Sequence, residues 1–256
     1  MLQTWLHALP FLLGAGFLTW LVSVQLRNVT IVDTLWSLMF VIAAFSYASS
    51  TLPPGPRAQL VLVLVTVWGL RLAIYLGRRN FGHEEDRRYQ KIRRRNEPGF
   101  AWKSLYLVFG LQAVLAWVIS LPLLGAIASD AGPLGWLDYA GAALCLVGLY
   151  FEAVGDWQLT RFKANPANAG QVMDQGLWGL TRHPNYFGDF CVWWGFGLVA
   201  LAAGAWWSLI GPALMSVLLL RVSGVTLLER DIGKRRPGYA EYIRRTNAFF
   251  PGPRRP

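Results

Sequence analysis

The chain has 256 residues, of which 54% are hydrophobic, and it carries a formal net charge of +10. Its apolar residues occur in long blocks and its charges in short ones, which excludes an ordinary soluble domain and is typical of a polytopic membrane protein. The charges are divided among the ends of the apolar blocks, which argues against a nucleic-acid-binding protein. Attraction to anionic lipid headgroups explains most of the basic excess without any further function.

Seven apolar blocks are long enough to cross a hydrocarbon core of about 30 Å, which needs roughly 20 helical residues. In chain order the predicted spans are residues 5–26, 31–50, 58–77, 104–128, 136–159, 186–204 and 206–226. The sequence therefore predicts an all-α fold with seven transmembrane helices. We expect one membrane domain over residues 1–256, with helices one to three in residues 1–103 and helices four to seven in residues 104–256.

The distribution of basic residues predicts how the chain is oriented. Nine of the 24 basic residues lie between Arg78 and Lys103, and nine more lie from Arg221 onward, whereas the opposite loops hold only Arg57. By the positive-inside rule, the N-terminus is outside and the basic loops and the C-terminus are cytoplasmic. This pattern predicts a multi-pass protein of the cell inner membrane.

Ionisable residues inside the predicted spans need a partner or a water-filled cavity, because an ionised carboxylate in hydrocarbon costs several kcal/mol. Residues four apart share a helix face, so polar residues form stripes at the cytoplasmic ends of three helices. These stripes are Trp68, Arg71, Tyr75 and Arg78; Glu152, Asp156, Thr160 and Lys163; and Asn185 with Asp189. They are either interhelical salt bridges or one polar cavity open to the cytosol, and their common depth favours the cavity.

A charged ligand of such a cavity has to satisfy both cations and carboxylates, which favours a nucleotide-containing cofactor such as a dinucleotide or S-adenosylmethionine. No glycine-rich dinucleotide fingerprint follows a strand, so binding by a Rossmann fold is not expected. The three histidines are far apart in the sequence and no Cys/His cluster is present, so we predict no metal site. Acid–base assistance by a buried carboxyl is the chemistry that the residues favour.

Several stretches together resemble one known family. They are residues 156–189, DWQLTRFKANPANAGQVMDQGLWGLTRHPNYFGD, the tail LLERDIGKRRPGYAEYIRRTNAFFP, the early residues Asn28, Asp33 and Trp36, and EEDRRYQ at 84–90. The first two resemble the C-terminal domain of the steroid 5α-reductase family, and the whole set is most similar to its bacterial branch. The resemblance covers nearly the whole chain and is most specific between residues 150 and 251.

The resemblance implies a seven-helix reductase with NADPH on the cytoplasmic side and a lipid-accessible pocket for a 3-oxo-Δ4 steroid or a similar lipid enone. In that family hydride reaches C5 while a carboxyl and a neighbouring phenol polarise the C3 carbonyl. Carried onto this sequence, Asp33 is the acid, Tyr75 assists it, and Trp36 and Trp68 line the substrate pocket. The implied cofactor ligands are Arg71, Asp156, Lys163, Arg182, His183, Asn185, Tyr186, Asp189 and Glu229.

Three alternatives stay open. Membrane methyltransferases of the isoprenylcysteine and phospholipid type share an R-H-P-x-Y core and a similar tail, so an S-adenosylmethionine-dependent methyltransferase is the main rival. A lipid-binding or transport protein without enzymatic activity is the second. Within the motif, His183 and Tyr186 either contact the cofactor or only cap and pack. The oligomeric state is not predicted.

Overall fold

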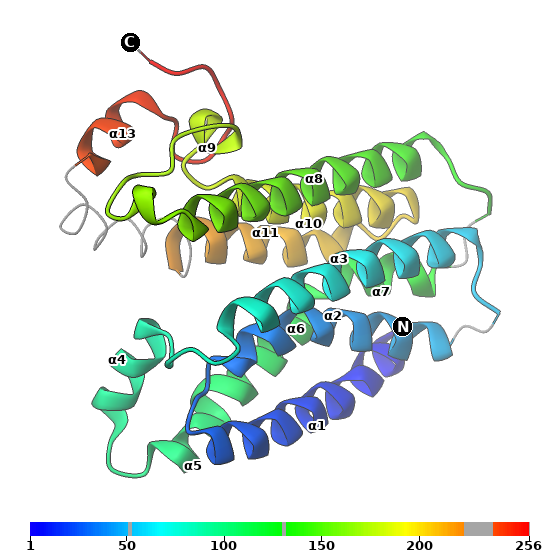
Figure 1. Ribbon diagram of the computed structural model, residues 1–256. Coiled ribbons are helices and arrows are strands. Elements are labelled where there is room, and N and C mark those ends of the chain that lie inside the picture. The colour runs from blue at the N-terminus through cyan, green and yellow to red at the C-terminus, as the bar shows by residue number, and fades with distance from the viewer. Residues whose placement is uncertain (51–52, 130–131, 223–237, 256) are drawn as a thin grey trace. The chain divides into compact units, whose positions relative to one another are not determined.

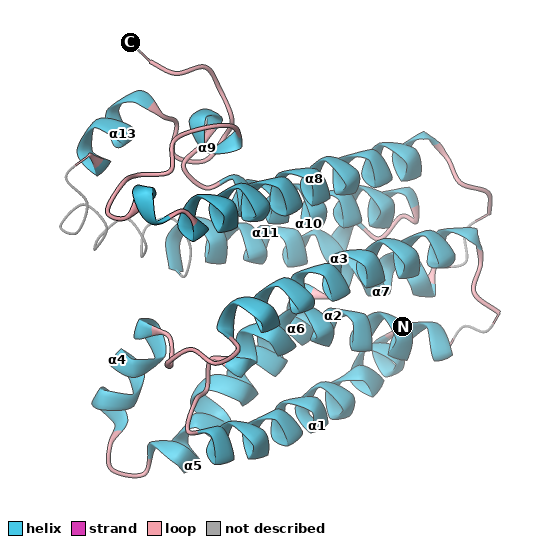
Figure 2. Ribbon diagram, in the orientation of Figure 1, coloured by secondary structure: helices cyan, strands magenta, loops and turns pink. Residues whose placement is uncertain are grey.

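The structure, a computed structural model, describes residues 1–50, 53–129, 132–222 and 238–255. All regular elements within these ranges are helices, and the described residues form no strand (Figure 1, Figure 2). Five helices are long and apolar enough to cross a membrane: α1 (Leu2–Leu26), α2 (Ile31–Ser49), α3 (Pro56–Asn80), the continuous helix Phe100–Ile119 and α8 (Trp136–Ala164). The all-α prediction is confirmed, and by these helices the chain is a multi-pass membrane protein.

Two further helical stretches coincide with the sixth and seventh predicted spans. Helix α10 covers Pro184–Ala202, and a shorter apolar stretch covers Trp206–Val222, with helix α11 (Ile210–Val217) at its centre. Pro184 begins α10 as predicted, since the first helical position has no backbone bond for a proline to lose. The total of seven spans and the orientation of the termini remain predictions.

The predicted fourth helix, residues 104–128, is divided in the structure. Helix α5 (Phe100–Ser104), a π-helical stretch (Leu105–Gly110) and α6 (Leu111–Ile119) run on continuously to Ser120, after which α7 (Leu121–Ala128) begins. Pro122 lies at the start of α7. A proline lacks the backbone donor and its ring clashes with the carbonyl four residues earlier, which favours an interruption of the helix at this point.

The chain divides into two compact units. The first comprises Met1–Gly135 with Val199–Gly211, and the second comprises Trp136–Leu198 with Pro212–Pro256. The predicted acid lies in the first unit, and the residues around the RHPNY motif lie in the second. The single membrane domain expected from the sequence stays a prediction.

The core of the first unit is built from α1, α2, α3, α6 and α7. Helices α2 and α3 approach closely because Gly69 lies in their contact, where an added Cβ would stand 2.6 Å from the side chain of Val41. Ser37 strengthens this contact by donating its hydroxyl to the carbonyl oxygen of Gly69 at 2.9 Å. Beside it, Phe40 and Trp68 are fully buried. Ser37 of α2 and Gly69 of α3 thus serve the packing of these two helices.

Two tryptophans of α1 mark the two ends of the first unit. Near the N-terminus, Trp5 stacks on Trp117 at 3.8 Å between ring centroids and donates to its carbonyl oxygen. Near the other end of α1, Trp20 donates its indole N–H to the carbonyl oxygen of Ala101 at 2.8 Å. The two bonding partners, Trp117 and Ala101, lie near opposite ends of the helix Phe100–Ile119. The N-terminus and the basic loop that begins after α3 therefore occupy opposite ends of this unit.

In the second unit, α8 and α10 cross at their glycines. A Cβ added at Gly148 would lie 2.5 Å from the carbonyl oxygen of Gly188, and one added at Gly195 would lie 2.6 Å from that of Gly141. Small residues at such spacing let helix backbones approach closely inside a membrane. The polar residues on the same two helices are therefore brought close to a common crossing.

Candidate functional site

Asp33 lies in the first turn of α2 and is the centre of a polar cluster in the first unit. Its carboxylate accepts a hydrogen bond from the phenol of Tyr89 at 2.6 Å and forms an ion pair with the guanidinium of Arg88 at 2.8 Å. The carboxylate side chain is 15% exposed. A carboxylate and a phenol whose positions are 56 residues apart are thus joined in one short hydrogen bond.

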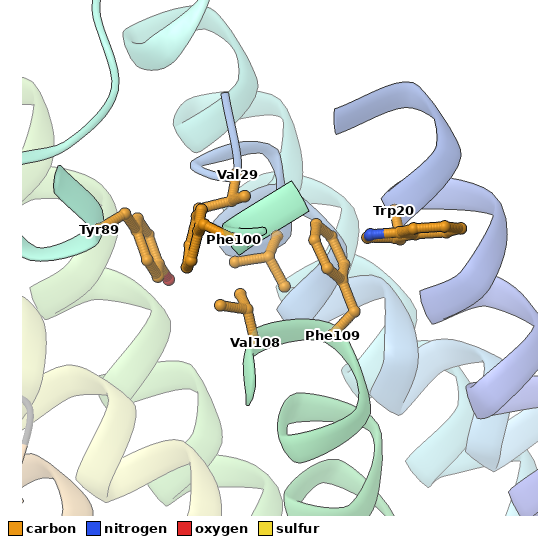
Figure 3. Packing of buried hydrophobic residues seen from close by; sticks show 7 residues of the cluster. Trp20, Val29, Tyr89, Phe100, Val108 and Phe109 are labelled. Carbon is orange, nitrogen blue, oxygen red and sulfur yellow. The ribbon is translucent and has the colours of Figure 1, made fainter. Parts of the chain in front are cut away.

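Helix α4 (Arg87–Asn96) supplies both partners of Asp33. Asp86 caps the helix by accepting from the backbone N–H of Arg88 at 2.8 Å, and three arginines occupy its last turn, where cations suit the helix dipole. Tyr89 is the residue of α4 that is buried. It packs in a cluster with Val29, Phe100 and other apolar residues, where its ring lies beside that of Phe100 (Figure 3).

The turn between α1 and α2 is bonded to the loop before α4. Helix α1 ends with Arg27 in the left-handed conformation (φ 52°), and the chain reaches α2 within four residues. The backbone N–H of Val29 donates to the carboxylate of Glu85 at 3.0 Å, and the backbone N–H of Asp86 donates to the hydroxyl of Thr30 at 2.8 Å. These bonds fix α4 against the start of α2, and so fix the distance from Tyr89 to Asp33.

Arg93 completes this arrangement, which we call the Asp33 corner: residues 27–33 together with residues 85–93. Its guanidinium binds both carboxylate oxygens of Glu85 at 2.8 Å and lies over the ring of Phe100 at 4.5 Å. A bidentate arginine–carboxylate pair is geometrically more specific than a single contact. The corner is therefore held by charged groups that are paired with each other.

Electrostatics in the corner favour a protonated phenol and charged partners around it. Burial, together with the neighbouring Asp33 carboxylate, raises the pKa of Tyr89 well above its ordinary value of 10.0. Burial alone would lower the pKa of Arg88, but Asp33, Tyr89 and Asp86 together outweigh it and raise that pKa. For Glu85, burial opposes ionisation, yet the hydrogen bonds from Arg93 and Val29 bring its pKa below 4.5. Tyr89 is thus a hydrogen-bond donor throughout the physiological range.

The other predicted residues of the first unit lie along α2 and α3. Arg71 and Arg79 each lie 5.7 Å from the centre of the Tyr75 ring, so Tyr75 stands between two cations. Trp68 is fully buried and Trp36 is half-buried, and both pack against Phe40. The phenol that the structure brings to the predicted acid is Tyr89, whereas the sequence analysis selected Tyr75. The cation beside Asp33 is Arg88.

In the second unit, four predicted polar residues come to one helix crossing. Glu152 and Asp156 are buried on α8. A Cβ added at Gly155 would lie 3.2 Å from the ring of Pro184, and one added at Gly188 would lie 2.7 Å from the side chain of Glu152. Asn185 and Asp189, half-buried, follow on the first turns of α10. The predicted polar stripes of α8 and α10 therefore meet. Lys163, two turns farther along α8, is exposed.

The arginine of the RHPNY motif binds the C-terminal tail. Arg182 is buried, and its guanidinium donates to the carbonyl oxygens of Ile243 at 3.1 Å and of Thr246 at 2.6 Å. Its backbone N–H donates to the carbonyl oxygen of Asn247 at 2.9 Å, and Thr181 donates its hydroxyl to that of Phe249 at 2.8 Å. We call this set the Arg182 clasp. Through these bonds Arg182 holds the tail, and its predicted role toward a cofactor stays a prediction.

The clasp continues through helix α9 (Leu177–Leu180) to α8. Tyr242, on helix α13 (Tyr239–Arg245), donates its phenol to the carbonyl oxygen of Trp178 at 2.6 Å, and Trp178 donates its indole N–H to that of Gly155 at 2.9 Å. Burial raises the pKa of Tyr242 above its ordinary value, so this phenol stays a donor. The tail is thus anchored to the same turn of α8 that carries Asp156.

The remaining motif residues pack on one another. His183 is buried and its ring stacks on that of Tyr186, with centroids 5.6 Å apart. The amide oxygen of Asn185 accepts from the backbone N–H of Tyr186 at 3.1 Å. Glu229, the last predicted cofactor residue, lies outside the residues that the structure describes. Among the described residues, no group of three or more His, Cys, Asp or Glu side chains is placed to hold a metal ion.

The second unit contains a polar cavity of about 490 Å³ between residues 170–174, α13 and the tail. Two ion pairs line it, Arg254 with Asp174 at 3.2 Å and Arg245 with Glu241 at 3.0 Å. The described residues that form its wall include none of the predicted site residues. Among the described residues that line it, two acids are paired with two arginines.

Four residues of the corner were not predicted as site residues from the sequence: Glu85, Arg88, Tyr89 and Arg93. The segment EEDRRYQ was noted, but only as part of a resemblance. Two sequence signals in this segment and just after it indicate a helix with one buried face. Asp86 is in a capping position, and Tyr89 is followed three and four residues later by Ile92 and Arg93. That these residues meet Asp33 follows only from the packing of α4 against the α1–α2 turn.

The fold and the corner define a helical multi-pass membrane protein with a charged cluster at one end of its first bundle. A family model described as "Protein of unknown function (DUF1295)" matches residues 19–246. The chain belongs to this family. No curated protein and no solved structure matches the chain.

Proposed function

We propose that the protein is an NADPH-dependent reductase that reduces the Δ4 carbon–carbon double bond of a 3-oxo steroid or a similar lipid enone. The observation that carries this proposal is the bond of 2.6 Å between the Tyr89 phenol and the Asp33 carboxylate, in the first turn of a membrane helix. A carboxyl with a neighbouring phenol is the pair that the resemblance to steroid 5α-reductases implies for polarising a carbonyl. We place the activity at the cytoplasmic side of the inner membrane, where the basic loops are expected.

Hydride addition to an enone places negative charge on the carbonyl oxygen, and donors aimed at that oxygen lower the barrier. In the corner the proton that can serve this role is on Tyr89, because Asp33 is ion-paired with Arg88 and acts as an acceptor. This revises the expectation that a neutral Asp33 is the donor. In the proposed reaction, Tyr89 turns its O–H from Asp33 to the substrate carbonyl, and the guanidinium of Arg88 adds positive charge beside the forming enolate. A proton from water then adds to the carbon next to the carbonyl and completes the reduction.

The residues of the second unit suit NADPH by their chemistry. Buried carboxylates at Glu152 and Asp156 can accept from ribose hydroxyls or an amide, and the exposed Lys163 can meet a phosphate. Asn185 and Asp189 extend the same polar surface. When bound, the cofactor supplies the hydride. Arg182, whose guanidinium holds the tail, is withdrawn from this set and serves to keep α9 and α13 in place.

The test compares two phenols. Purified protein in lipid nanodiscs is assayed for NADPH binding and for turnover of a 4-ene-3-one steroid, as wild type, Tyr89→Phe, Asp33→Asn and Tyr75→Phe. We expect Tyr89→Phe to lose about 10²–10³-fold in turnover, the usual effect of removing one oxyanion donor. Asp33→Asn should also lower turnover, because it removes the carboxylate that positions Tyr89 and Arg88. Both variants should keep NADPH affinity. Tyr75→Phe is the matched control and should stay within a few-fold of wild type.

Each other outcome rejects part of the proposal. Equal losses of turnover in Tyr89→Phe and Tyr75→Phe would show that Tyr89 is not the specific donor to the substrate carbonyl. Binding of S-adenosylmethionine with no binding of NADPH would replace the reductase by the methyltransferase of the rival interpretation. Binding of neither cofactor would reject both enzymes.

A further inference from the structure

The guanidinium of Arg88 uses only part of its hydrogen-bonding capacity inside the protein. Its Nε donates to the carboxylate of Asp86 at 3.0 Å, and its Nη2 donates to that of Asp33 at 2.8 Å. An arginine carries its N–H donors in a fixed fork, and no hydrogen bond joins Nη1 to another described residue. The side chain is 35% exposed, and none of its nitrogens is a buried atom without a partner. A ligand can therefore reach the two donors of Nη1.

The carboxylate of Asp33 also keeps accepting capacity. Its Oδ1 accepts from the phenol of Tyr89 and its Oδ2 from Arg88, whereas a carboxylate has about four lone-pair sites. Its side chain is 15% exposed. The two terminal nitrogens of a guanidinium are about 2.3 Å apart, because two C–N bonds of about 1.33 Å meet at its carbon. Nη1 of Arg88 therefore lies within about 5.1 Å of Oδ2 of Asp33.

A single oxygen of a ligand can bridge these two groups. Two hydrogen bonds of about 2.8 Å span up to about 5.6 Å, which is enough for one oxygen between Nη1 and Oδ2. This oxygen has to accept from Arg88 and donate to Asp33. A hydroxyl does both, whereas a ketone or ether oxygen only accepts. While Tyr89 is bonded to Asp33, the corner is thus complementary to an alcohol.

The place of the corner in the membrane indicates what the rest of this alcohol is. Asp33 lies in the first turn of α2, a candidate span, and so lies near the end of the hydrocarbon layer. Trp36, half-buried, lies one turn farther into the span. An amphiphile with one hydroxyl on an apolar body places the hydroxyl at this depth, because burial of the body and hydration of the hydroxyl are both favourable.

We propose that the Asp33 corner binds the hydroxyl of a lipid alcohol, of the sterol or isoprenoid kind, between Arg88 and Asp33. An alcohol has no carbonyl to take up the charge of an added hydride, so it occupies the corner without being reduced. Lipid alcohols therefore regulate the enzyme by excluding its enone from the corner. This regulatory role rests on the proposed function, whereas the binding rests only on the geometry of the corner.

The experiment measures equilibrium binding to the whole protein in lipid nanodiscs without NADPH, so that no turnover is involved. The probe is a tritiated steroid 3-alcohol, and its competitors are the unlabelled alcohol, the corresponding 3-ketone and the 3-methyl ether. We expect the wild type to bind the alcohol about tenfold or more tightly than the other two, the usual effect of one hydrogen bond to a charged group. The ketone is smaller than the alcohol and the ether is larger, so size alone does not produce the same loss in both.

Two variants locate the bound hydroxyl. Asp33→Asn should bring the affinity for the alcohol to within a few-fold of that for the ketone, because a neutral amide is a weaker acceptor than a carboxylate. Arg94→Gln removes an exposed arginine of α4 outside the corner and is the control, which should keep the preference.

Three results would overturn the proposal. The first is equal affinity of the wild type for alcohol, ketone and ether, which does not depend on any variant being folded. The second is a preference for the alcohol that is as strong in Asp33→Asn as in Arg94→Gln, which would place the alcohol elsewhere. The third is competition by cyclohexanol at the same concentration as the steroid alcohol, which would show that the apolar body is not recognised. None of these results concerns turnover of the enone, so the proposed function keeps its separate test.

Discussion

The Asp33 corner and the Arg182 clasp are both polar clusters at helix ends, but their hydrogen bonds differ in kind. In the corner, charged side chains bind each other: Asp33 with Arg88, and Glu85 with Arg93. In the clasp, the side chains of Arg182 and Thr181 bind backbone carbonyl oxygens of the tail. A side chain bonded to the backbone fixes the path of the chain, whereas side chains bonded to each other can be redirected toward a ligand. The arginine of the motif that was most conspicuous in the sequence thus binds the C-terminal tail, and the bonded pair of Asp33 and Tyr89 lies in the first unit.

The largest effect that this comparison predicts is on stability and comes from Arg182→Ala. Each hydrogen bond to a charged group contributes about 1.5–3 kcal/mol, and the loss leaves buried carbonyls unsatisfied, so we expect a loss of about 3–5 kcal/mol. The measurement is thermal unfolding in detergent combined with limited proteolysis, in which cleavage near residue 245 should appear first. Arg244→Ala, an exposed arginine on α13, is the control. If Arg182→Ala were as stable as the wild type and lost only cofactor affinity, Arg182 would be a cofactor ligand and not a residue that stabilises the tail.

Gly188→Ala is expected to have the next largest effect. Its Cβ would lie 2.5 Å from the carbonyl oxygen of Gly148, so the two helix backbones have to separate. Overpacking of this kind costs about 1–3 kcal/mol. Gly14→Ala is the matched control, since nothing lies within 4 Å of a Cβ there, and it should be neutral or slightly stabilising. Equal unfolding temperatures of the two variants would show that the crossing which carries Glu152 and Asp189 is not tightly packed.

Tyr89→Phe should affect stability less than the clasp variant does. It removes one hydrogen bond to the charged Asp33 while the ion pair with Arg88 remains, so we expect a loss of about 1.5–3 kcal/mol. The same unfolding assay, run beside Arg182→Ala, gives the contrast directly. If Tyr89→Phe destabilised the protein as strongly as Arg182→Ala, the phenol would be a structural clasp as well, and a catalytic role would lose its support.

The smallest predicted effect depends on pH and concerns Glu85. Its pKa is lower in the folded protein than the ordinary value of 4.5, so the folded state binds fewer protons than the unfolded state. The stabilisation is therefore present above pH 4.5 and is lost as the pH falls through the folded pKa. The protection factors of the α4 amides, which are corrected for the intrinsic pH dependence of exchange, should fall below pH 4.5 in the wild type. Glu85→Gln should already show lower protection at pH 7 and lose part of this acid dependence, since Asp86, whose pKa is lowered by its bonds with Arg88 despite burial, keeps the rest. An unchanged profile would show that Arg93 is not held through Glu85.

The sequence by itself determined the properties that depend on local composition and spacing. Long apolar blocks predicted an all-helical membrane protein, because a span needs enough consecutive apolar residues to cross the hydrocarbon. The spacing of Glu152 and Asp156, and of Asn185 and Asp189, placed each pair on one face of its helix, and the structure brings these faces to one crossing. Pro184 marked the start of α10 correctly.

Only the tertiary structure decided which residues meet across the chain. Tyr75 was a reasonable partner for Asp33 by its depth in a neighbouring helix, yet the turn after α1 and the bonds of Glu85 and Asp86 bring Tyr89 to the acid instead. Likewise, an arginine beside a histidine and a tyrosine resembles a ligand site by composition, but Arg182 binds carbonyls that come from residues 61 and 64 positions later. The physical reason is that periodicity fixes the face of a helix on which a side chain lies, whereas its partner depends on how the loops fold back, which no local pattern encodes.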